Sequence, residues 1–82
     1  MKYDYFGKQI HLGDLVILRK YVGKNNADAL CIGEVVKFCP NTVAVDIKHI
    51  IDGSDYVIGK IAKVNSEFTV KLNQEQAYQL SA

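Results

Sequence analysis

Apolar residues in this chain gather into five short runs, and each run ends at a turn signal. Runs rich in Val and Ile that are separated by Gly, Pro, Asn and Asp are typical of the strands of a small all-β domain. One run alternates in steps of two, with Val43, Val45 and Ile47 as its apolar positions. We therefore expect strands over residues 15–20, 30–38, 42–51, 56–64 and 68–72.

Local features refine these strands. Residues 15–18 are four consecutive apolar residues, which indicates a strand that is covered on both faces or enters the core. Gly33 lies inside the second run and Gly59 inside the fourth, where a missing side chain marks a bulge. Pro40 and Asn41 predict a tight hairpin. The expected core takes the apolar positions of every strand: Val16, Leu18, Ile32, Val35, Val43, Val45, Ile47, Ile58, Ile61, Val70 and Leu72.

The two ends differ from this strand region. Residues 1–12 carry an aromatic stretch and then a turn at Gly7 and Lys8, so they form either an extended arm or a short hairpin. Asn73 followed by Gln76 matches a capping box, which predicts a short helix from residue 74 to about residue 80. With 82 residues, the chain has material for one domain: arm 1–12, strand region 13–72 and helix or tail 73–82.

The charge and hydropathy of the chain limit the kinds of partner it can bind and the cellular compartment we expect for it. Ten Lys and Arg residues face nine Asp and Glu residues, a balance that argues against binding nucleic acid or anionic lipid by bulk charge. No apolar run approaches the roughly 20 residues that span a bilayer, and residues 1–5 lack the apolar stretch of a signal peptide. Cys31 and Cys39 lie at the two ends of one predicted strand, eight residues apart. In a straight strand they are about 26 Å apart, which is too far for a disulfide. We expect a soluble cytoplasmic protein with two free thiols.

Residues that carry chemistry are few and scattered. His11, His49, Cys31 and Cys39 share no spacing typical of a zinc site. Neither histidine is placed by the sequence beside a serine or cysteine that it could activate. Asp52 and Asp55 flank a Gly-Ser pair, so turn formation explains them. We expect no enzyme activity, no metal and no cofactor.

Three segments together resemble a known group of domains. They are Gly13-Asp14-Leu15-Val16-Ile17, Gly33-Glu34-Val35-Val36 and the alternating segment of residues 42–47. This pattern resembles small SH3-like barrels, including the KOW and Tudor-like groups, over residues 10–72. The resemblance implies a five-stranded SH3-like barrel. In place of the glycine-spaced loop of the KOW group, residues 21–29 contain a single glycine. The start of the chain also resembles small accessory proteins encoded by bacteriophages.

Two surfaces are candidates for binding. In the loop over residues 21–29 the apolar pattern stops and polar side chains accumulate, and Tyr56 lies beside another turn. Basic residues of the later strands form the alternative, a nucleic-acid-binding face, although lysines along strands ordinarily protect sheet edges. The first surface comprises Tyr21, Lys24, Asn25, Asn26 and Tyr56, and the second comprises Lys37, Lys48, His49, Lys60, Lys63 and Lys71.

Together these observations predict a non-catalytic protein-interaction module, and the phage likeness suggests a modulator or inhibitor of a host protein. Counterion release from phosphates needs several converging cations, so near-neutral charge favours a protein partner. A nucleic-acid-associated domain of KOW type is the alternative. Assembly into a small homo-oligomer is compatible with the sequence, and we expect no association with a membrane.

Overall fold

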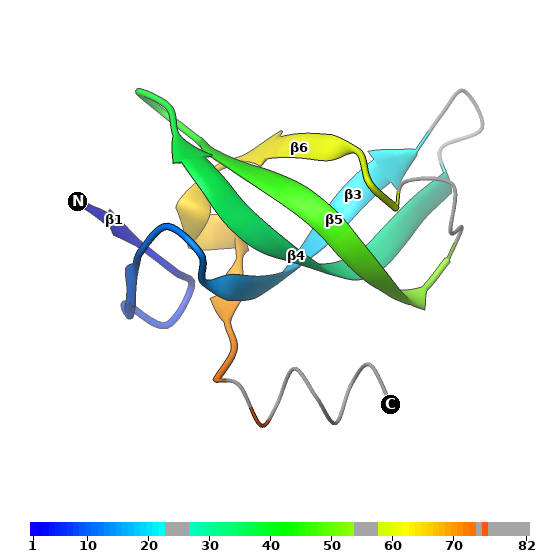
Figure 1. The fold of residues 1–82 in the computed structure, drawn as a ribbon, viewed down its shortest axis with the longest axis horizontal. Helices are drawn as coiled ribbons and strands as arrows, with labels where there is room; N and C mark the ends of the chain where they lie inside the picture. The colour runs from blue at the N-terminus through cyan, green and yellow to red at the C-terminus, as the bar shows by residue number, and fades with distance from the viewer. Residues whose placement is uncertain (23–26, 54–57, 74, 76–82) are drawn as a thin grey trace.

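The fold is all-β, as predicted (Figure 1). A computed structural model describes residues 1–22, 27–53, 58–73 and 75. Strands β1 (Lys2–Tyr3) and β2 (Gln9–Ile10) form a small antiparallel pair. A second, strongly twisted sheet has the spatial order β6-β5-β4-β3-β7 and is antiparallel throughout. Its strands are β3 (Leu15–Val22), β4 (Ala27–Phe38), β5 (Val43–Asp52), β6 (Ile61–Val64) and β7 (Val70–Lys71).

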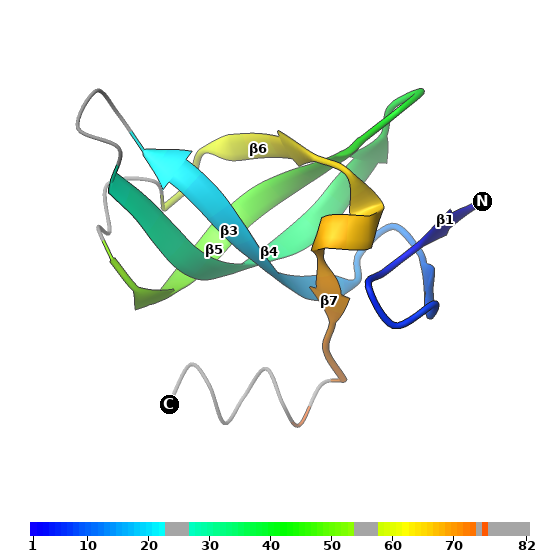
Figure 2. The ribbon, with the colours of Figure 1, turned by 180° about the vertical axis from the view of Figure 1, so that it is seen from behind.

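A one-turn 3-10 helix, η2 (Ser66–Phe68), joins the two edge strands of this sheet. Figure 2 shows η2 between β6 and β7, on the side of the molecule where the N-terminal segment runs. Strand β1 is in contact with η2. The N-terminal pair therefore lies at the end of the sheet where β6 passes into β7, and the hairpin alternative for residues 1–12 is correct.

The large sheet buries apolar side chains on both faces. Along β3, Val16 and Leu18 enter the main core, whereas Leu15 and Ile17 pack in a second cluster. Successive residues of a strand point to opposite faces, so the run of four apolar residues is covered on both sides, as predicted. The main core contains Ile10, Val16, Leu18, Ala29, Cys31, Val35, Val43, Val45, Ile47 and Ala62. The second cluster contains Ile32 and Leu72, with Leu15, Ile17 and Ile51 packed against them.

Gly33 marks a bulge in β4, as the sequence predicts. The register between β4 and β5 shifts between Ile32 and Gly33, and the two strands approach closely there. A Cβ atom at position 33 would collide with Cγ1 of Val45 and lie 2.8 Å from the carbonyl oxygen of Asp46. Only glycine therefore fits this crossing without displacing β5.

We expect Gly33→Ala to lower the free energy of unfolding by about 1 to 3 kcal/mol, the usual cost of overpacking a core. Urea denaturation followed by circular dichroism measures this loss. Adding Val45→Ala removes the methyl group that the new Cβ meets, so the double variant should lose less than the sum of the two single losses. Strictly additive losses would show that the two positions are not in contact.

Several predicted strand positions are wrong. The fourth strand begins at Ile61 instead of residue 56, and Gly59 lies in a turn with φ of 82° instead of in a bulge. Ala62 is the residue of β6 that enters the core, and Ile58 and Ile61 are about half exposed. A shift of one residue along a strand exchanges its buried and exposed faces. The apolar pattern of residues 58–64 does not decide which face of this four-residue strand is buried.

The last predicted strand is also shorter than expected. Residue 68 belongs to η2 and is largely exposed, so β7 contains two residues where five were predicted. Leu72 is buried as expected, and Val70 is half-buried. Two strands extend into the predicted loop over residues 21–29. Strand β3 continues as far as Val22, and strand β4 already begins at Ala27. The expected C-terminal helix falls mainly on residues 76–82, outside the described part of the chain.

Two further local predictions are confirmed. The backbone N–H of Cys39 donates to the carbonyl of Thr42 at 2.8 Å, which closes the tight hairpin around Pro40 and Asn41. Cys31 and Cys39 are free thiols. Cys31 is fully buried and its sulfur lies 3.4 Å from the carbonyl oxygen of Leu18, whereas Cys39 is half-buried at the turn.

Candidate functional site

The loop surface that the sequence favours lies mostly outside the described residues. Tyr21 is part of β3, where its backbone pairs with Asp28 of β4. Lys24, Asn25, Asn26 and Tyr56 belong to residues 23–26 and 54–57, which are not described. The proposed surface around these residues therefore stays a prediction.

The basic residues of the alternative face are spread over the sheet. Lys71 lies on β7 at one edge, and its ammonium forms an ion pair with Asp14 at 3.1 Å. Lys48 of β5 forms an ion pair with Asp46 at 2.9 Å. This hydrogen-bonded carboxylate raises the pKa of Lys48. At least two of the six candidate cations are thus paired with carboxylates among the described residues.

Two other candidate lysines are brought together. Lys37 of β4 and Lys63 of β6 are both register partners of Ala44, on opposite sides of β5. Register partners on adjacent strands share one face of a sheet, so the two exposed lysines flank the buried Ala44. Lys60 precedes β6 and is exposed, whereas His49 of β5 is half-buried. Lys63 and Lys71 lie on β6 and β7, the two edge strands of the sheet.

Four exposed aromatic side chains gather where the N-terminal pair meets η2. Tyr3, Tyr5, Phe6 and Phe68 are 45%, 69%, 68% and 66% exposed. They come from β1, the turn after it and η2, which lie side by side. The rings of Tyr5 and Phe6 meet edge to face, with their centroids 5.2 Å apart. We call these four residues the aromatic end.

A buried carboxylate holds the backbone of the aromatic end in place. The side chain of Asp4 accepts hydrogen bonds from the backbone N–H groups of Phe6 at 2.9 Å, Lys8 at 2.8 Å and Lys71 at 2.8 Å. The first two bonds shape the turn that carries Tyr5 and Phe6, and the third ties this turn to β7. Asp4 is only 4% exposed, and its three backbone donors compensate the loss of hydration.

Main-chain hydrogen bonds reinforce the same turn. The N–H of Asp4 donates to the carbonyl of Lys8 at 2.8 Å, and the N–H of Gly7 donates to the carbonyl of Asp4 at 3.0 Å. The N–H of Tyr5 donates to the carbonyl of Thr69 at 2.8 Å. Because Thr69 directly follows Phe68, this last bond brings the aromatic residues of the turn beside the aromatic residue of η2.

The ionised form of Asp4 is favoured despite its burial. Burial by itself raises the pKa of this carboxyl, and the hydrogen bonds from the backbone of Lys71, Lys8 and Phe6 lower it. The net effect is a pKa below the ordinary value for aspartate. The carboxylate is therefore a structural element of the turn at neutral pH.

A second carboxylate fixes the far end of the N-terminal pair. Asp14 accepts a hydrogen bond from the backbone N–H of His11 at 2.7 Å and pairs with the ammonium of Lys71, which also donates to the carbonyl of Gln9 at 3.0 Å. Burial raises the pKa of Asp14, but the bonds from His11 and Lys71 outweigh it, so the pKa is lowered. Lys71 thus connects β7 to Gln9 of β2 and to Asp14, which directly precedes β3.

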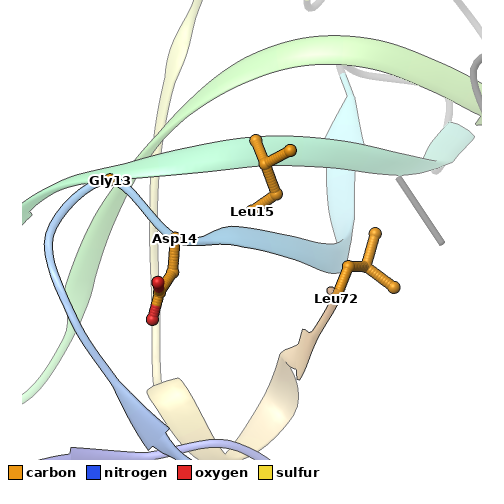
Figure 3. Close-up of a pocket in the computed structure, with 4 residues that line it drawn as sticks. All are labelled: Gly13, Asp14, Leu15 and Leu72. Atoms are coloured by element: carbon orange, nitrogen blue, oxygen red, sulfur yellow. The ribbon is translucent and has the colours of Figure 1, made fainter. Parts of the chain in front are cut away.

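An open depression of about 250 Å³ adjoins this second carboxylate. Its described lining consists of Gly13, Asp14, Leu15 and Leu72. Figure 3 shows the carboxylate of Asp14 directed away from the side chains of the two leucines. The depression is an edge of the second apolar cluster, and none of its four described lining residues is a serine, cysteine or histidine.

Metal-binding groups do not converge in the described part of the chain. Within residues 1–22, 27–53, 58–73 and 75, no three His, Cys, Asp or Glu side chains gather closely enough to hold an ion. His11 contacts Asp14, with 3.6 Å between Nδ1 and the carboxylate oxygen. The described residues also include no helix with the length and hydropathy needed to cross a membrane.

Sequence reasoning missed the aromatic end as a surface. The signal was present in the closely spaced Tyr3, Tyr5 and Phe6, with Asp4 between them in an Asp-x-x-Gly turn. Phe68 was expected at the start of the fifth strand, and its exposure follows from the 3-10 turn that replaces the start of that strand.

Comparisons with known proteins place the chain in one family. A family model described as a domain of unknown function, DUF7205, matches residues 2–50, which contain β1 to β4 and most of β5. No curated protein and no solved structure matches the chain. The family model covers more than half of the sequence, including Asp4, Gly33 and three of the four residues of the aromatic end. The chain therefore belongs to the DUF7205 family of domains of unknown function.

Proposed function

We propose that this chain is a non-catalytic protein-binding module that binds its partner through the aromatic end. The observation that carries this proposal is the exposure of four aromatic side chains on one braced turn and the adjoining η2. Aromatic side chains are enriched among the residues that dominate protein interfaces. Because Asp4 already fixes the backbone beneath them, binding costs less ordering entropy than it would on a loose arm.

The proposed architecture is an SH3-like barrel. The strand order β6-β5-β4-β3-β7 and the 3-10 turn between the two edge strands support it. The bulge at Gly33 also supports it, since a bulged, coiled strand allows a small sheet to curve around its core. An SH3-like barrel by itself indicates no particular function, because such barrels serve many functions.

A protein partner is favoured over nucleic acid. Two of the candidate cations, Lys48 and Lys71, are paired with carboxylates, and the net charge of the chain is only +1. Binding to phosphates draws its affinity from several cations that release counterions together. The free thiols of Cys31 and Cys39 suit a cytoplasmic location, and the phage likeness suggests a host protein as the partner.

Site-specific photo-crosslinking tests the proposal. A benzophenone amino acid replaces Phe6 or Phe68 in one pair of variants, and Ile58 or Ile61 in a control pair whose residues are 50% and 52% exposed just before and at the start of β6. Irradiation in an extract of the native host should give protein adducts at the first pair only. Equal adducts at both pairs, or none, would contradict the proposal.

The nucleic-acid alternative is tested in parallel by titrating generic DNA and RNA with the purified protein. We expect no binding at low salt. Binding that weakens steeply with salt and is lost in the Lys37→Ala plus Lys63→Ala variant would establish the alternative and place it on the face around Ala44.

A further inference from the structure

We propose that residues 1–10 form a clasp that opens and closes as one unit against the large sheet, and that its closure assembles the aromatic end. We call these residues the N-terminal clasp. The open form is a minor state in which the rest of the sheet stays folded. This inference goes beyond the proposed function, because it concerns how the surface is built and holds whether or not the surface binds a protein.

The N-terminal clasp is fastened chiefly to β7 and to the residue before it. The carboxylate of Asp4 accepts a hydrogen bond from the backbone N–H of Lys71 at 2.8 Å, and the N–H of Tyr5 donates to the carbonyl of Thr69 at 2.8 Å. The ammonium of Lys71 donates to the carbonyl of Gln9 at 3.0 Å. These bonds all end on or directly beside a strand of two residues.

Little apolar surface holds the clasp in place. Among the described residues of the main core, Ile10 alone comes from the clasp, whereas β3 to β6 supply the others. The ammonium of Lys2 adds an exposed hydrogen bond to the carbonyl of Pro40 at 3.1 Å. Segments with few buried apolar contacts open at a lower free energy than the core strands. We therefore expect the clasp to open while β3 to β6 stay paired.

A turn with its own hydrogen bonds separates the clasp from β3. The N–H of Asp14 donates to the carbonyl of His11 at 3.1 Å, and the N–H of His11 donates to the carboxylate of Asp14 at 2.7 Å. The N–H of Gly13 donates to the carbonyl of Val35 at 2.8 Å, and the N–H of Val35 donates to the carbonyl of Asp14 at 2.9 Å. The turn is thus tied to β4, so the hinge of the clasp lies between Ile10 and His11.

The parts of the clasp depend on one another and on β7. Strands β1 and β2 pair over two residues each, and an isolated pair of this size is not stable in water. The turn between them is held by the carboxylate of Asp4, which also accepts the hydrogen bond from Lys71. Detachment from β7 therefore removes the support of the pair and of the turn in a single event.

Opening takes the aromatic end apart. Tyr3, Tyr5 and Phe6 belong to the clasp, whereas Phe68 belongs to η2. The hydrogen bond from Tyr5 to Thr69 and the contact between β1 and η2 hold the two parts side by side. The aromatic end is therefore complete only in the closed form.

Amide hydrogen exchange measured by NMR tests this inference residue by residue. The backbone N–H groups of Tyr5, Phe6, Lys8 and Lys71 all donate to acceptors that closure of the clasp holds in place. They should share one protection factor, at least about tenfold below that of the N–H groups inside the β3-β4-β5 ladder. A different factor for each of the four, or the factor of the ladder for all four, would overturn the inference.

Ala29→Gly distinguishes opening of the clasp from unfolding of the whole chain. Ala29 is buried in β4 and lies about 20 Å along the strand from Val35, to which the turn is tied. Glycine weakens the strand, so protection inside the ladder should fall by about fivefold. The four N–H groups that report on the clasp should keep their protection, because the clasp opens from a sheet that is still folded. An equal fall in both sets would mean that the clasp opens only by global unfolding.

Lys71→Met tests the fastening itself. This variant removes the contacts of the ammonium with Gln9 and Asp14 and keeps the backbone N–H that bonds to Asp4. Protection in the clasp should fall by about fivefold or more. The matched control is Lys63→Met on β6, which should leave this protection unchanged, and two-dimensional NMR spectra check the fold of every variant. Wild-type protection in the Lys71→Met protein would overturn the inference.

Discussion

Val45→Asp is expected to abolish cooperative folding. Val45 is fully buried in the main core, where it pairs with Val35 of β4 and Ala62 of β6. An unpaired carboxylate at such a site costs several kcal/mol, either as burial of its charge or as the work of protonating it. A chain of this length has a free energy of unfolding of roughly 4 to 12 kcal/mol, so the substitution removes most or all of it.

Thermal and urea denaturation followed by circular dichroism measure this effect. The control is Val36→Asp, one residue from the partner of Val45, because Val36 is 43% exposed at the bulged end of β4. The control should keep a cooperative transition within about 1 kcal/mol of the wild type. A wild-type transition in the Val45→Asp variant would mean that the inward face of β5 is assigned incorrectly.

Asp4→Asn should destabilise the protein by about 2 to 4 kcal/mol, since hydrogen bonds to a charged group contribute about 1.5 to 3 kcal/mol each and an amide retains only part of them. An asparagine has one acceptor oxygen, so its NH₂ group faces at least one of the backbone N–H donors of Phe6, Lys8 and Lys71. The loss falls on the turn that carries the aromatic end and on its tie to β7.

The same substitution should change how stability depends on pH. The pKa of Asp4 is lower in the folded chain than in the unfolded chain, so its stabilisation is complete above about pH 4 and is lost as the pH falls through the folded value. The wild type should therefore lose stability on acidification more steeply than Asp4→Asn. Asp14 contributes in the same direction in both proteins and leaves a residual slope.

Urea denaturation at a series of pH values between about 2.5 and 7 measures both effects, since this range spans the titration of aspartate. Asp52→Asn is the control, because it removes an exposed carboxylate at the end of β5. It should keep the acid dependence of the wild type. An Asp4→Asn variant with the stability and acid slope of the wild type would show that the carboxylate does not brace the turn.

The aromatic end, which we propose as the binding surface, could be predicted from the sequence only in part. Aromatic residues near the start of the chain are visible in the sequence, but a strand pattern assigns such residues to a core by default. Their exposure depends on the contact between the turn after β1 and Thr69, residues more than sixty positions apart. The same holds for Asp4, whose bond to the backbone of Lys71 spans 67 positions. Long-range hydrogen bonds of this kind leave no local pattern.

The sequence by itself determined the all-β class, the first three strands of the large sheet, the bulge at Gly33 and the hairpin at Pro40. These features follow from local rules, because residue alternation, glycine and proline act on the backbone within a few positions. Strand β5 shows this most clearly, since its buried Val43, Val45 and Ile47 are the alternating residues of the sequence.

Only the tertiary structure decided the phase of β6, the conversion of residues 66–68 into a 3-10 helix and the bracing of the N-terminal pair. In each case a distant partner outweighs local preference: β5 selects Ala62 for the core, and Asp4 and Asp14 bind β7 through Lys71. Short segments carry too little apolar surface to choose their own face, so packing against residues far along the chain makes the choice for them.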